Sequence, residues 1–300
     1  MLQNPGQALR KLLEKPEIIL APGIFDGISA RVAEQAGFPA GYVSGAGVAA
    51  SYLGEPDIGL TNGSDVADVA RRIAVKANIP ILSDADTGYG NALNTIRTVW
   101  DLERAGVAAV QFEDQVAPKR CGHLDGKQCI SAGEFAAKIK AAKNEKMYKD
   151  TVIVARTDAR AVYHLDEALR RGEMYLSAGA DVLFIEAPQT LEEIRTITEA
   201  FKGVPLLTNQ VIGGKTPRLT AKEAEEMGYK IIIYPDVMCY CASVMYRRAC
   251  ESILKSGQSW DAIPGAHDSR DLFITMGIKE WRDTEQRYGA CEAAEEKLFR

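Results

Sequence analysis

The chain has 300 residues, of which 46% are hydrophobic, and its 36 Lys and Arg residues against 41 Asp and Glu residues give a formal net charge of −5. The acidic balance and the interleaving of both charge signs argue against a nucleic-acid partner, because phosphate binding needs clustered Lys and Arg side chains. No apolar run approaches the roughly 18 residues that a membrane span requires. We therefore expect a protein that binds neither nucleic acid nor a membrane.

The six cysteines and the N-terminal segment point to a reducing compartment. Six cysteines in a chain of this length do not make a disulfide framework, so we expect reduced thiols. The N-terminal segment lacks the apolar core of a signal peptide. The expected location is the cytoplasm, and the mitochondrial matrix is the alternative if a leader has been removed.

Eight short apolar runs, rich in β-branched residues, recur along the chain. They cover residues 17–23, 40–45, 80–86, 108–114, 151–158, 181–187, 205–210 and 230–235. Near-continuous apolar runs of this length are typical of parallel strands buried on both faces. The segments between most of them have helical spacing. Eight strand–helix units predict an α/β fold, the (β/α)8 TIM barrel, in preference to an open parallel sheet.

Glycines punctuate several of the predicted helices. The segments EQAGF (34–38), ERAGV (103–107), LSAGAD (176–181) and EEMGY (225–229) each place a glycine shortly before a strand. Helices commonly end at a residue in the left-handed conformation, which glycine adopts without strain. These four glycines are therefore predicted to end helices with positive φ angles.

The C-terminal part continues beyond the barrel. We predict a single barrel domain over residues 1–300, with the barrel at about 17–255 and a helical tail at about 256–300. The tail exceeds what one closing helix needs. We expect it to pack on a neighbouring subunit or to cover the outside of the barrel.

Acidic side chains follow the predicted strands, at the edge where barrel enzymes place their chemistry. Asp84 and Asp86 end one run and, two residues apart in a strand, are predicted to share a face, while Glu113 ends the next run. Buried carboxylates need a compensating charge. Oxygen ligands without histidine suit Mg²⁺ better than Zn²⁺. The alternative is that these carboxylates form structural ion pairs with Arg156 and nearby lysines.

A polar loop, residues 117–130, follows the fourth predicted strand. It holds Cys121 beside Lys119, Arg120 and His123. Cationic neighbours lower the pKa of a thiol, which makes Cys121 a candidate nucleophile or proton donor. The alternative is a loop cysteine without a catalytic role.

A dinucleotide site is the competing interpretation of SGAGVAA (44–50), which fits the pattern G-x-G-x-x-A. The acidic residue about twenty positions later is Asp65, which lies at a predicted helix N-terminus. The dinucleotide fingerprint needs its acid at the end of a second strand. We therefore do not expect a dinucleotide cofactor.

Three segments together resemble the isocitrate lyase/phosphoenolpyruvate mutase superfamily. They are DADTGYGNALN (84–94), FEDQVAPKRCGHLDGK (112–127) and VARTDA (154–159). Within the superfamily, the chain is similar to the 2-methylisocitrate lyase-like branch, which includes 2,3-dimethylmalate lyases and oxaloacetate hydrolases. The similarity runs from about Leu20 to Pro235, with the motifs in matching order and spacing. The resemblance implies a (β/α)8 barrel whose last helix is exchanged between subunits, in a homotetramer built from two helix-swapped dimers.

The resemblance also implies roles for individual residues. Mg²⁺, with Mn²⁺ as the alternative, would be held at Asp84 and Asp86, with Glu113 and Asp57 around them. The catalytic residues would be Cys121, Arg156, Tyr42, His123 and Glu186. The substrate-binding residues would be Ser44, Gly45, Gly122 and Asn209. Cys121 would lie on a gating loop and protonate the leaving carbanion, and Arg156 would bind the developing enolate.

The implied activity is that of a Mg²⁺-dependent carbon–carbon lyase. A substituted 2-hydroxy di- or tricarboxylate, of the 2-methylisocitrate or 2,3-dimethylmalate type, would give a 2-oxo acid such as pyruvate and a carboxylic acid such as succinate. The initiating base is open between Tyr42 and a carboxylate acting through metal-bound water.

Other activities compete with this one. They are an oxaloacetate hydrolase that forms oxalate and acetate, a phosphoenolpyruvate or phosphonopyruvate phosphomutase-type enzyme, and a non-catalytic binding barrel. The Cys-Gly-His loop favours carbon–carbon cleavage over phosphomutase chemistry. Pro235 favours the lyases, because the hydrolases tend to have serine at that position.

Overall fold

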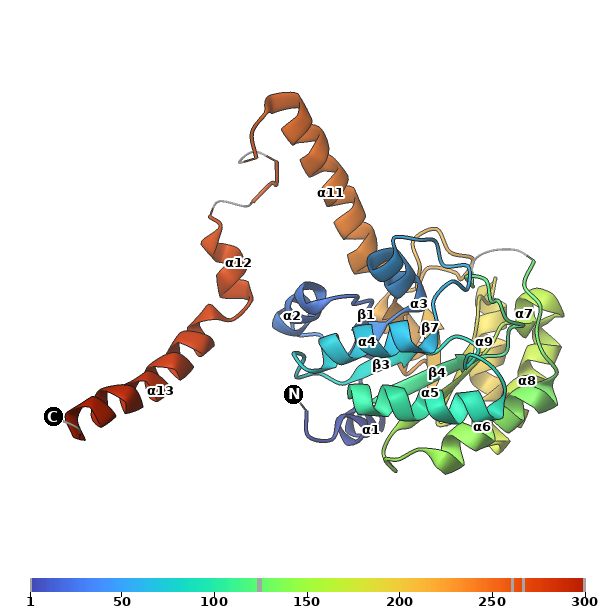
Figure 1. Cartoon of the computed structure of the whole chain (residues 1–300). Helices are drawn as coiled ribbons and strands as arrows, with labels where there is room; N and C mark the ends of the chain where they lie inside the picture. The colour runs from blue at the N-terminus through green and yellow to red at the C-terminus, as the bar shows by residue number, and fades with distance from the viewer. Residues whose placement is uncertain (1, 123–125, 260–261, 266–267, 299–300) are drawn as a thin grey trace. The chain divides into compact units, whose positions relative to one another are not determined.

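The computed structural model describes residues 2–122, 126–259, 262–265 and 268–298. Within these ranges, eight parallel strands form one sheet in the order β1-β8-β7-β6-β5-β4-β3-β2. They are β1 (Ile19–Pro22), β2 (Gly41–Val43), β3 (Ile81–Asp84), β4 (Ala109–Glu113), β5 (Val152–Thr157), β6 (Val182–Ile185), β7 (Leu206–Asn209) and β8 (Ile231–Tyr234). A parallel bridge between Gly23 and Tyr42 links the two edge strands, so the barrel is nearly closed (Figure 1). The predicted (β/α)8 barrel is confirmed, and each predicted run contains one strand.

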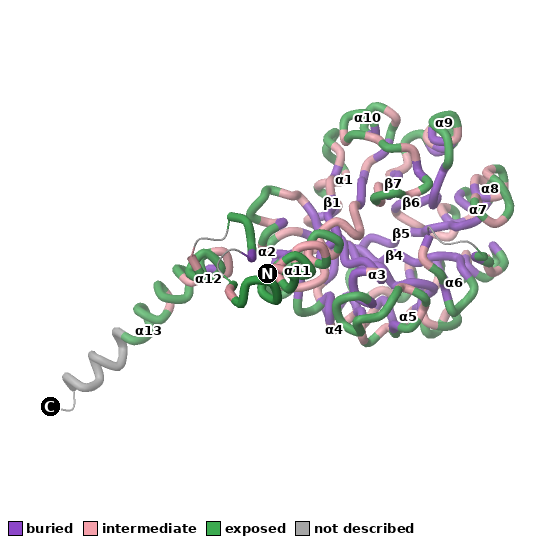
Figure 2. The backbone as a smooth tube through the Cα atoms, turned by 90° about the horizontal axis from the view of Figure 1, so that it is seen from above, coloured by how far each residue is buried: buried purple, intermediate pink, exposed green. Residues whose placement is uncertain are grey.

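Helices surround the strands. They are α1 (Pro5–Glu14), α2 (Gly27–Gln35), α3 (Gly45–Val48), α4 (Gly63–Ala74), α5 (Ala92–Ala105), α6 (Ala132–Glu145), α7 (Ala159–Val162), α8 (Leu165–Ser177), α9 (Leu191–Ala200) and α10 (Ala221–Glu226), with a π-helical turn, η1 (Ala49–Leu53), after α3. Figure 2 shows the buried strands inside and the exposed backs of α4, α5, α6, α8 and α9 outside. The short α3 and its π-helical turn do not form the long helix that follows a dinucleotide fingerprint.

Local signals set the ends of these helices. The side chains of Asn62 and Asn91 accept hydrogen bonds from first-turn amides of α4 and α5, which satisfies donors that a helix leaves unpaired. The four glycines predicted to end helices are Gly37, Gly106, Gly179 and Gly228. Their φ angles are +89°, +91°, +111° and +102°. The prediction of left-handed helix ends is confirmed.

The core uses both faces of the sheet. Val152 and Val154 of β5 belong to one apolar cluster, whereas Ile153 and Ala155 belong to another. Because successive strand residues point to opposite faces, the first cluster fills the barrel and the second lies between strands and helices. Polar groups are therefore concentrated at the strand ends, where the site is expected.

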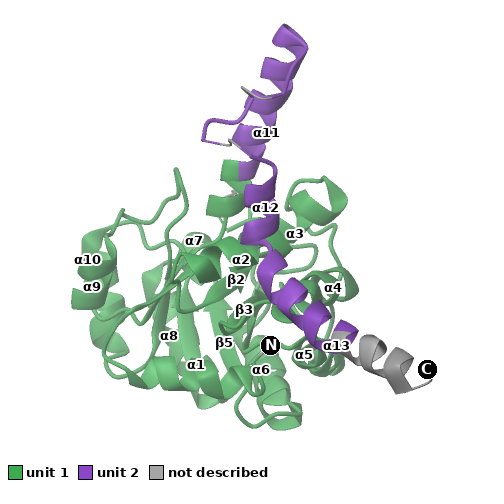
Figure 3. Ribbon diagram, turned by 90° about the vertical axis from the view of Figure 1, so that its left-hand side faces the viewer, with its two compact units in different colours: residues 1–241 green, residues 242–300 purple. Residues whose placement is uncertain are grey.

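The chain divides into two compact units, residues 1–241 and 242–300 (Figure 3). The first unit contains the barrel. α11 (Val237–Ser256) begins in the first unit and continues in the second, which also holds α12 (Arg270–Thr275) and α13 (Ile278–Leu298). The single domain over 1–300, the tail from about 256 and the exchange of a helix between subunits stay predictions. Across the described ranges, the helices are too short or too polar to cross a membrane.

Candidate functional site

The predicted site residues gather at the carboxyl ends of the strands. β3, β4 and β7 end at Asp84, Glu113 and Asn209, and Glu186 directly follows β6. The buried members of the predicted set are Tyr42, Ser44, Asp84, Asp86, Glu113, Arg156, Glu186 and Asn209, together with Gly45 and Gly122. His123 lies outside the described residues, so its role stays a prediction. Polar side chains buried at one end of an apolar barrel mark this end as the candidate active site.

Two carboxylates converge beside Gly45. A Cβ atom at Gly45 would lie 2.9 Å from Asp86 Oδ1 and 3.2 Å from Asp84 Oδ2, and the Gly45 N–H donates to Asp84 Oδ2 at 3.2 Å. The predicted reason for the convergence is wrong, because β3 ends at Asp84 and Asp86 has a φ of +45°. A left-handed turn after the strand, and not the strand period, brings Asp86 to Asp84.

Two cations lie among the carboxylates. Lys119 Nζ is 2.6 Å from Asp57 Oδ1 and 3.0 Å from Asp86 Oδ1, and Arg156 Nη1 is 3.3 Å from Glu113 Oε2. The ion pairs that stood as the alternative interpretation are therefore present within the acidic cluster. The sequence identified Lys119 only as a neighbour of Cys121, because its contacts with residues 57 and 86 depend on how separate loops meet.

The oxygen donors fit a divalent cation. Burial, and then the charge of Asp86, raise the pKa of Asp84, and burial raises the pKa of Glu113 well above its ordinary value although Arg156 opposes the shift. The buried Glu113 Oε1 accepts no hydrogen bond from the part of the chain that is described. Carboxylates whose pKa is raised by burial and like charge are stabilised in the ionised form by an added cation.

The number of converging carboxylates is compatible with a magnesium site. Across the described ranges, His, Cys, Asp and Glu side chains do not assemble into a group of three arranged to hold a metal ion. Mg²⁺ is commonly bound through one or two carboxylates and completes its octahedron with water and substrate oxygens. The pair Asp84 and Asp86 supplies such a partial set.

Arg156 is fixed at the centre of the site. Its Nε and Nη2 donate to Asp158 Oδ2 and Oδ1 at 2.9 and 3.1 Å, and its guanidinium lies 5.3 Å from the ring centroid of Phe184. Burial disfavours the charge, but the carboxylates of Asp158, Glu113 and Glu186 outweigh it and raise the pKa of Arg156 well above its ordinary value. Arg156 is therefore a permanent cation whose position is set before any ligand binds.

The loop after β4 lies directly on this arginine. A Cβ atom at Gly122 would be 2.5 Å from Arg156 Nη2 and 2.8 Å from Glu186 Oε1, so a residue with a side chain would displace one of the groups. Cys121 precedes Gly122 in the chain and is partly buried. Gly122, the neighbour of the predicted thiol in the chain, therefore lies against the predicted cation.

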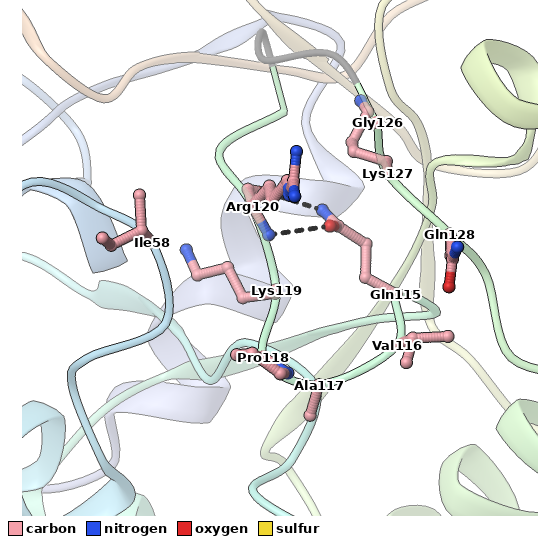
Figure 4. A pocket seen from close by; sticks show the side chains of 10 residues that line it. All are labelled: Ile58, Gln115, Val116, Ala117, Pro118, Lys119, Arg120, Gly126, Lys127 and Gln128. Carbon is pink, nitrogen blue, oxygen red and sulfur yellow. Dashed lines mark hydrogen bonds between the residues drawn. The ribbon is translucent and has the colours of Figure 1, made fainter.

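The base of the loop is held by a backbone β-bridge and by the side-chain amide of Gln115. Gln115 and Cys129 form an antiparallel bridge. Gln115 Nε2 donates to the carbonyl oxygen of Arg120 at 2.9 Å, and Gln115 Oε1 accepts from the N–H of Arg120 at 3.0 Å (Figure 4). Gln115 and Arg120 line a pocket of about 520 Å³ together with Ile58 and Lys127.

Tyr42 and Ser44 lie at the carboxyl end of β2. The Tyr42 hydroxyl accepts a hydrogen bond from Gln111 Nε2 at 2.8 Å, and burial, followed by the charge of Asp84, raises the pKa of Tyr42 well above its ordinary value. The Ser44 hydroxyl donates to the carbonyl oxygen of Pro235 at 3.0 Å. Tyr42 is therefore a neutral phenol, and Pro235 lies next to the predicted substrate-binding serine.

Two carboxylates at the ends of β4 and β5 support the site, although the sequence assigned them no specific role. Asp158 accepts two hydrogen bonds from Arg156. Residues two apart near a strand end point to the same face, and this spacing was the one sequence signal for the pair. Asp114 is fully buried and accepts hydrogen bonds from the Thr157 hydroxyl, the Asp158 N–H, Arg171 Nη1 and the Tyr175 hydroxyl. No local pattern reveals these four partners, because they come from β5, α8 and the turn after β5.

Comparisons with known proteins agree with this geometry. The family model for phosphoenolpyruvate phosphomutase matches residues 9–254. The chain is 41% identical over 289 residues to the 2,3-dimethylmalate lyase of Eubacterium barkeri, a match that covers 95% of this chain and 98% of that protein. It is 40% identical over 301 residues to the 2-methylisocitrate lyase of Aeropyrum pernix, with coverage of 100% and 95%.

Solved structures share the whole fold. An oxaloacetate acetylhydrolase in complex with the inhibitor 3,3-difluorooxalacetate matches with a TM-score of 0.91 and 35% identity, covering 95% of this chain and 97% of that one. A phosphonopyruvate hydrolase in complex with oxalate and Mg²⁺ matches with a TM-score of 0.85 and 30% identity, covering 95% and 99%.

Proposed function

Because this chain belongs to the phosphoenolpyruvate mutase/isocitrate lyase superfamily and is one of its lyases, we propose that it cleaves the C2–C3 bond of a substituted 2-hydroxy di- or tricarboxylate. The proposed substrate is of the 2-methylisocitrate or 2,3-dimethylmalate type. The products are a 2-oxo acid such as pyruvate and a carboxylic acid such as succinate. The observation that carries the proposal is the Cys121–Gly122 segment, which lies against the fixed guanidinium of Arg156 beside a buried carboxylate cluster.

The proposed cofactor is Mg²⁺, with Mn²⁺ as the alternative. It would be held by Asp84 and Asp86, with Glu113 and Asp57 around them. A cation held by these residues would supply Lewis-acid polarisation of the substrate oxygens. The converging oxygens at Gly45 and the raised pKa values of Asp84 and Glu113 support this assignment.

The first half of the reaction uses groups that are already in position. Ser44 and Gly45 bind the half of the substrate that becomes the 2-oxo acid. Arg156 stabilises the negative charge that develops on the enolate, and its bonds to Asp158 remove the cost of reorienting it. In the cation-free site the phenol of Tyr42 is neutral. We therefore assign the removal of the C2 hydroxyl proton to a carboxylate, and to Tyr42 a hydrogen bond to the developing charge.

The second half of the reaction is a proton transfer to carbon. As the C2–C3 bond breaks, its electron pair passes to C3, and the Cys121 thiol supplies the proton that completes the carboxylic acid. Gly122 presents backbone to the substrate, since a side chain there would meet Arg156 and Glu186. Glu186 and Asn209 lie around the remaining carboxylate of the substrate, and the predicted role of His123 there falls outside the described residues.

Oxaloacetate hydrolysis is the second candidate activity. A structural neighbour with that activity supports it. Pro235 argues for the lyase, because it lies beside Ser44 and offers no hydroxyl where the hydrolases tend to have serine. The two activities leave different products, so one assay separates them.

We also propose that the protein acts as a cytoplasmic homotetramer built from two helix-swapped dimers. Large apolar side chains in residues 242–300 are exposed: Leu272 is 53% exposed, Phe273 58%, Ile274 65% and Trp281 63%. Apolar faces of this kind are typical of subunit contacts. Light scattering of the full chain, compared with a Phe273→Asp variant, tests the assembly.

The assay of function is a product analysis with three substrates. The purified protein is incubated with Mg²⁺, or with a chelator as the control, and 2-methylisocitrate, 2,3-dimethylmalate or oxaloacetate. We expect Mg²⁺-dependent release of pyruvate with succinate or propionate from the first two. Predominant release of oxalate and acetate from oxaloacetate would identify the hydrolase instead. If none of the three substrates is consumed, the proposed activity is wrong.

A further inference from the structure

One carboxylate joins the loop after β4 to the central arginine. Lys127 Nζ lies 2.7 Å from Asp158 Oδ1, the same oxygen that accepts from Arg156 Nη2 at 3.1 Å. Lys127 Nζ also donates to the carbonyl oxygen of Gly122. The side chains of Lys127 and Asp158 are 3% and 0% exposed. A single buried ammonium therefore connects the backbone next to Cys121 to the carboxylate that orients Arg156.

This arrangement is anchored to the rigid part of the barrel. The N–H of Asp158 donates to Asp114 Oδ1 at 2.9 Å, and Asp114 Oδ2 accepts from Arg171 and Tyr175 of α8. Burial alone would raise the pKa of Asp158, but Arg156 and Lys127 outweigh it and hold that pKa below its ordinary value. A charged lysine buried in a loop is stable only where its partners are this well fixed.

We propose that Lys127 and Asp158 are positioning residues that set the Gly122 carbonyl relative to the Arg156 guanidinium and thereby hold the Cys121 thiol at the reacting carbon. The proposal rests on the proposed function for the role of Cys121. Gly122 is tightly packed, because a Cβ atom added there would lie 2.5 Å from Arg156 Nη2. A shift of the loop that carries Cys121 and Gly122 therefore moves the Cys121 thiol. The distance from the thiol to the reacting carbon of the substrate changes as a result.

A second lysine–aspartate pair provides a matched control. Lys143 Nζ lies 2.7 Å from Asp181 Oδ1, the same separation as in the Lys127 pair. Asp181 also accepts from the N–H of Ile153 near the start of β5, at the opposite end of the strand from Arg156. Lys143→Met removes an ion pair with the same Nζ–Oδ1 distance, whose side chains are 33% and 14% exposed, and leaves the site contacts in place.

The experiment measures the position of Cys121 in two independent ways. The first is the rate of Cys121 alkylation by iodoacetamide in the ligand-free full-length protein, resolved by peptide mass spectrometry against the exposed Cys241. The second is kcat and KM with the substrate that the wild type consumes. The variants are Lys127→Met, Lys127→Gln, Lys127→Arg and Asp158→Asn, with Lys143→Met as the control.

We expect Lys127→Met and Asp158→Asn to change the Cys121 alkylation rate, relative to that of Cys241, by about tenfold. Both variants should also lower kcat by about 10- to 100-fold with a smaller change in KM, because a misplaced group loses its reactive geometry. Lys127→Arg keeps the charge and should recover part of both losses. Lys143→Met should match the wild type in both measurements.

Unchanged alkylation and kcat in a folded Lys127→Met or Lys127→Gln variant, within about twofold, would overturn the positioning role. If both Lys127 variants fail to fold while Lys143→Met folds, the pair is a folding element, and the positioning role is also overturned. The alkylation measurement needs no turnover. A changed alkylation rate in a protein that consumes none of the three substrates would therefore leave the positioning inference standing and reject only the proposed function.

Discussion

Gly122→Ala is the most direct test of the site geometry. The added Cβ would lie 2.5 Å from Arg156 Nη2, about 0.9 Å closer than the 3.4 Å at which ordinary van der Waals contact begins. The backbone φ of Gly122 is outside the left-handed region, so the neighbours and not the backbone exclude a side chain. Arg156 cannot yield, because Asp158 and Glu113 hold it at 2.9 and 3.3 Å. The loop must therefore move by about 1 Å.

A displacement of this size is expected to lower kcat by on the order of 10²-fold, which corresponds to about 2.7 kcal/mol of lost transition-state stabilisation. Steady-state kinetics measure it, and thermal unfolding reports whether the fold is kept. Gly133→Ala is the matched control, since a Cβ at Gly133 in α6 meets no described atom within 4 Å. That variant should keep its kcat and gain up to about 1 kcal/mol in unfolding free energy. A Gly122→Ala enzyme with kcat within about twofold of the wild type would refute the close contact of this loop with Arg156.

Three further predictions concern individual side chains. Cys121→Ser should lower kcat by about 10²- to 10⁴-fold, which is the range for loss of a general acid. Mg²⁺-dependent binding of oxalate, measured by calorimetry, should stay intact. Retained turnover would show that Cys121 is not the proton donor. Asp84→Asn should weaken Mg²⁺ binding by at least about tenfold in the same titration, whereas the surface variant Asp68→Asn should not, and equal affinities would contradict the metal assignment. Burial and a neighbouring carboxylate raise the pKa of Cys129, so a smaller fraction of this thiol is ionised at neutral pH. Its alkylation should therefore be much slower than that of the exposed Cys241, and it should accelerate as the pH rises above the ordinary thiol range. Equal alkylation rates at neutral pH would contradict that shift.

Several features of the fold were predictable because their causes are local. The run at 151–158 is apolar on both faces, and β5 occupies Val152–Thr157 within it. The glycine of ERAGV ends α5 with a φ of +91°, since only a residue without a Cβ adopts that conformation readily. In both cases the structure depends on properties of neighbours in the chain.

The candidate site was predictable in composition but not in detail. Asp84, Glu113 and Arg156 were expected at the strand ends and lie there. The strand period led to the wrong geometry for Asp86, because it assumed that the strand continues where the backbone instead turns into the left-handed region. The position of Lys119 between Asp57 and Asp86 was missed, since it depends on two loops that are far apart in the sequence.

The sequence by itself determined the eight strands, the glycine-ended helices and the set of acidic, basic and thiol groups at one end of the barrel, because periodicity and turn chemistry act over a few residues. Only the tertiary structure decided which charges meet. It placed Lys119 among the carboxylates, Gly122 on Arg156, and Lys127 with Arg156 on one oxygen of Asp158. These contacts depend on the register of adjacent strands and on the paths of the loops between them, and no property of a single segment encodes either.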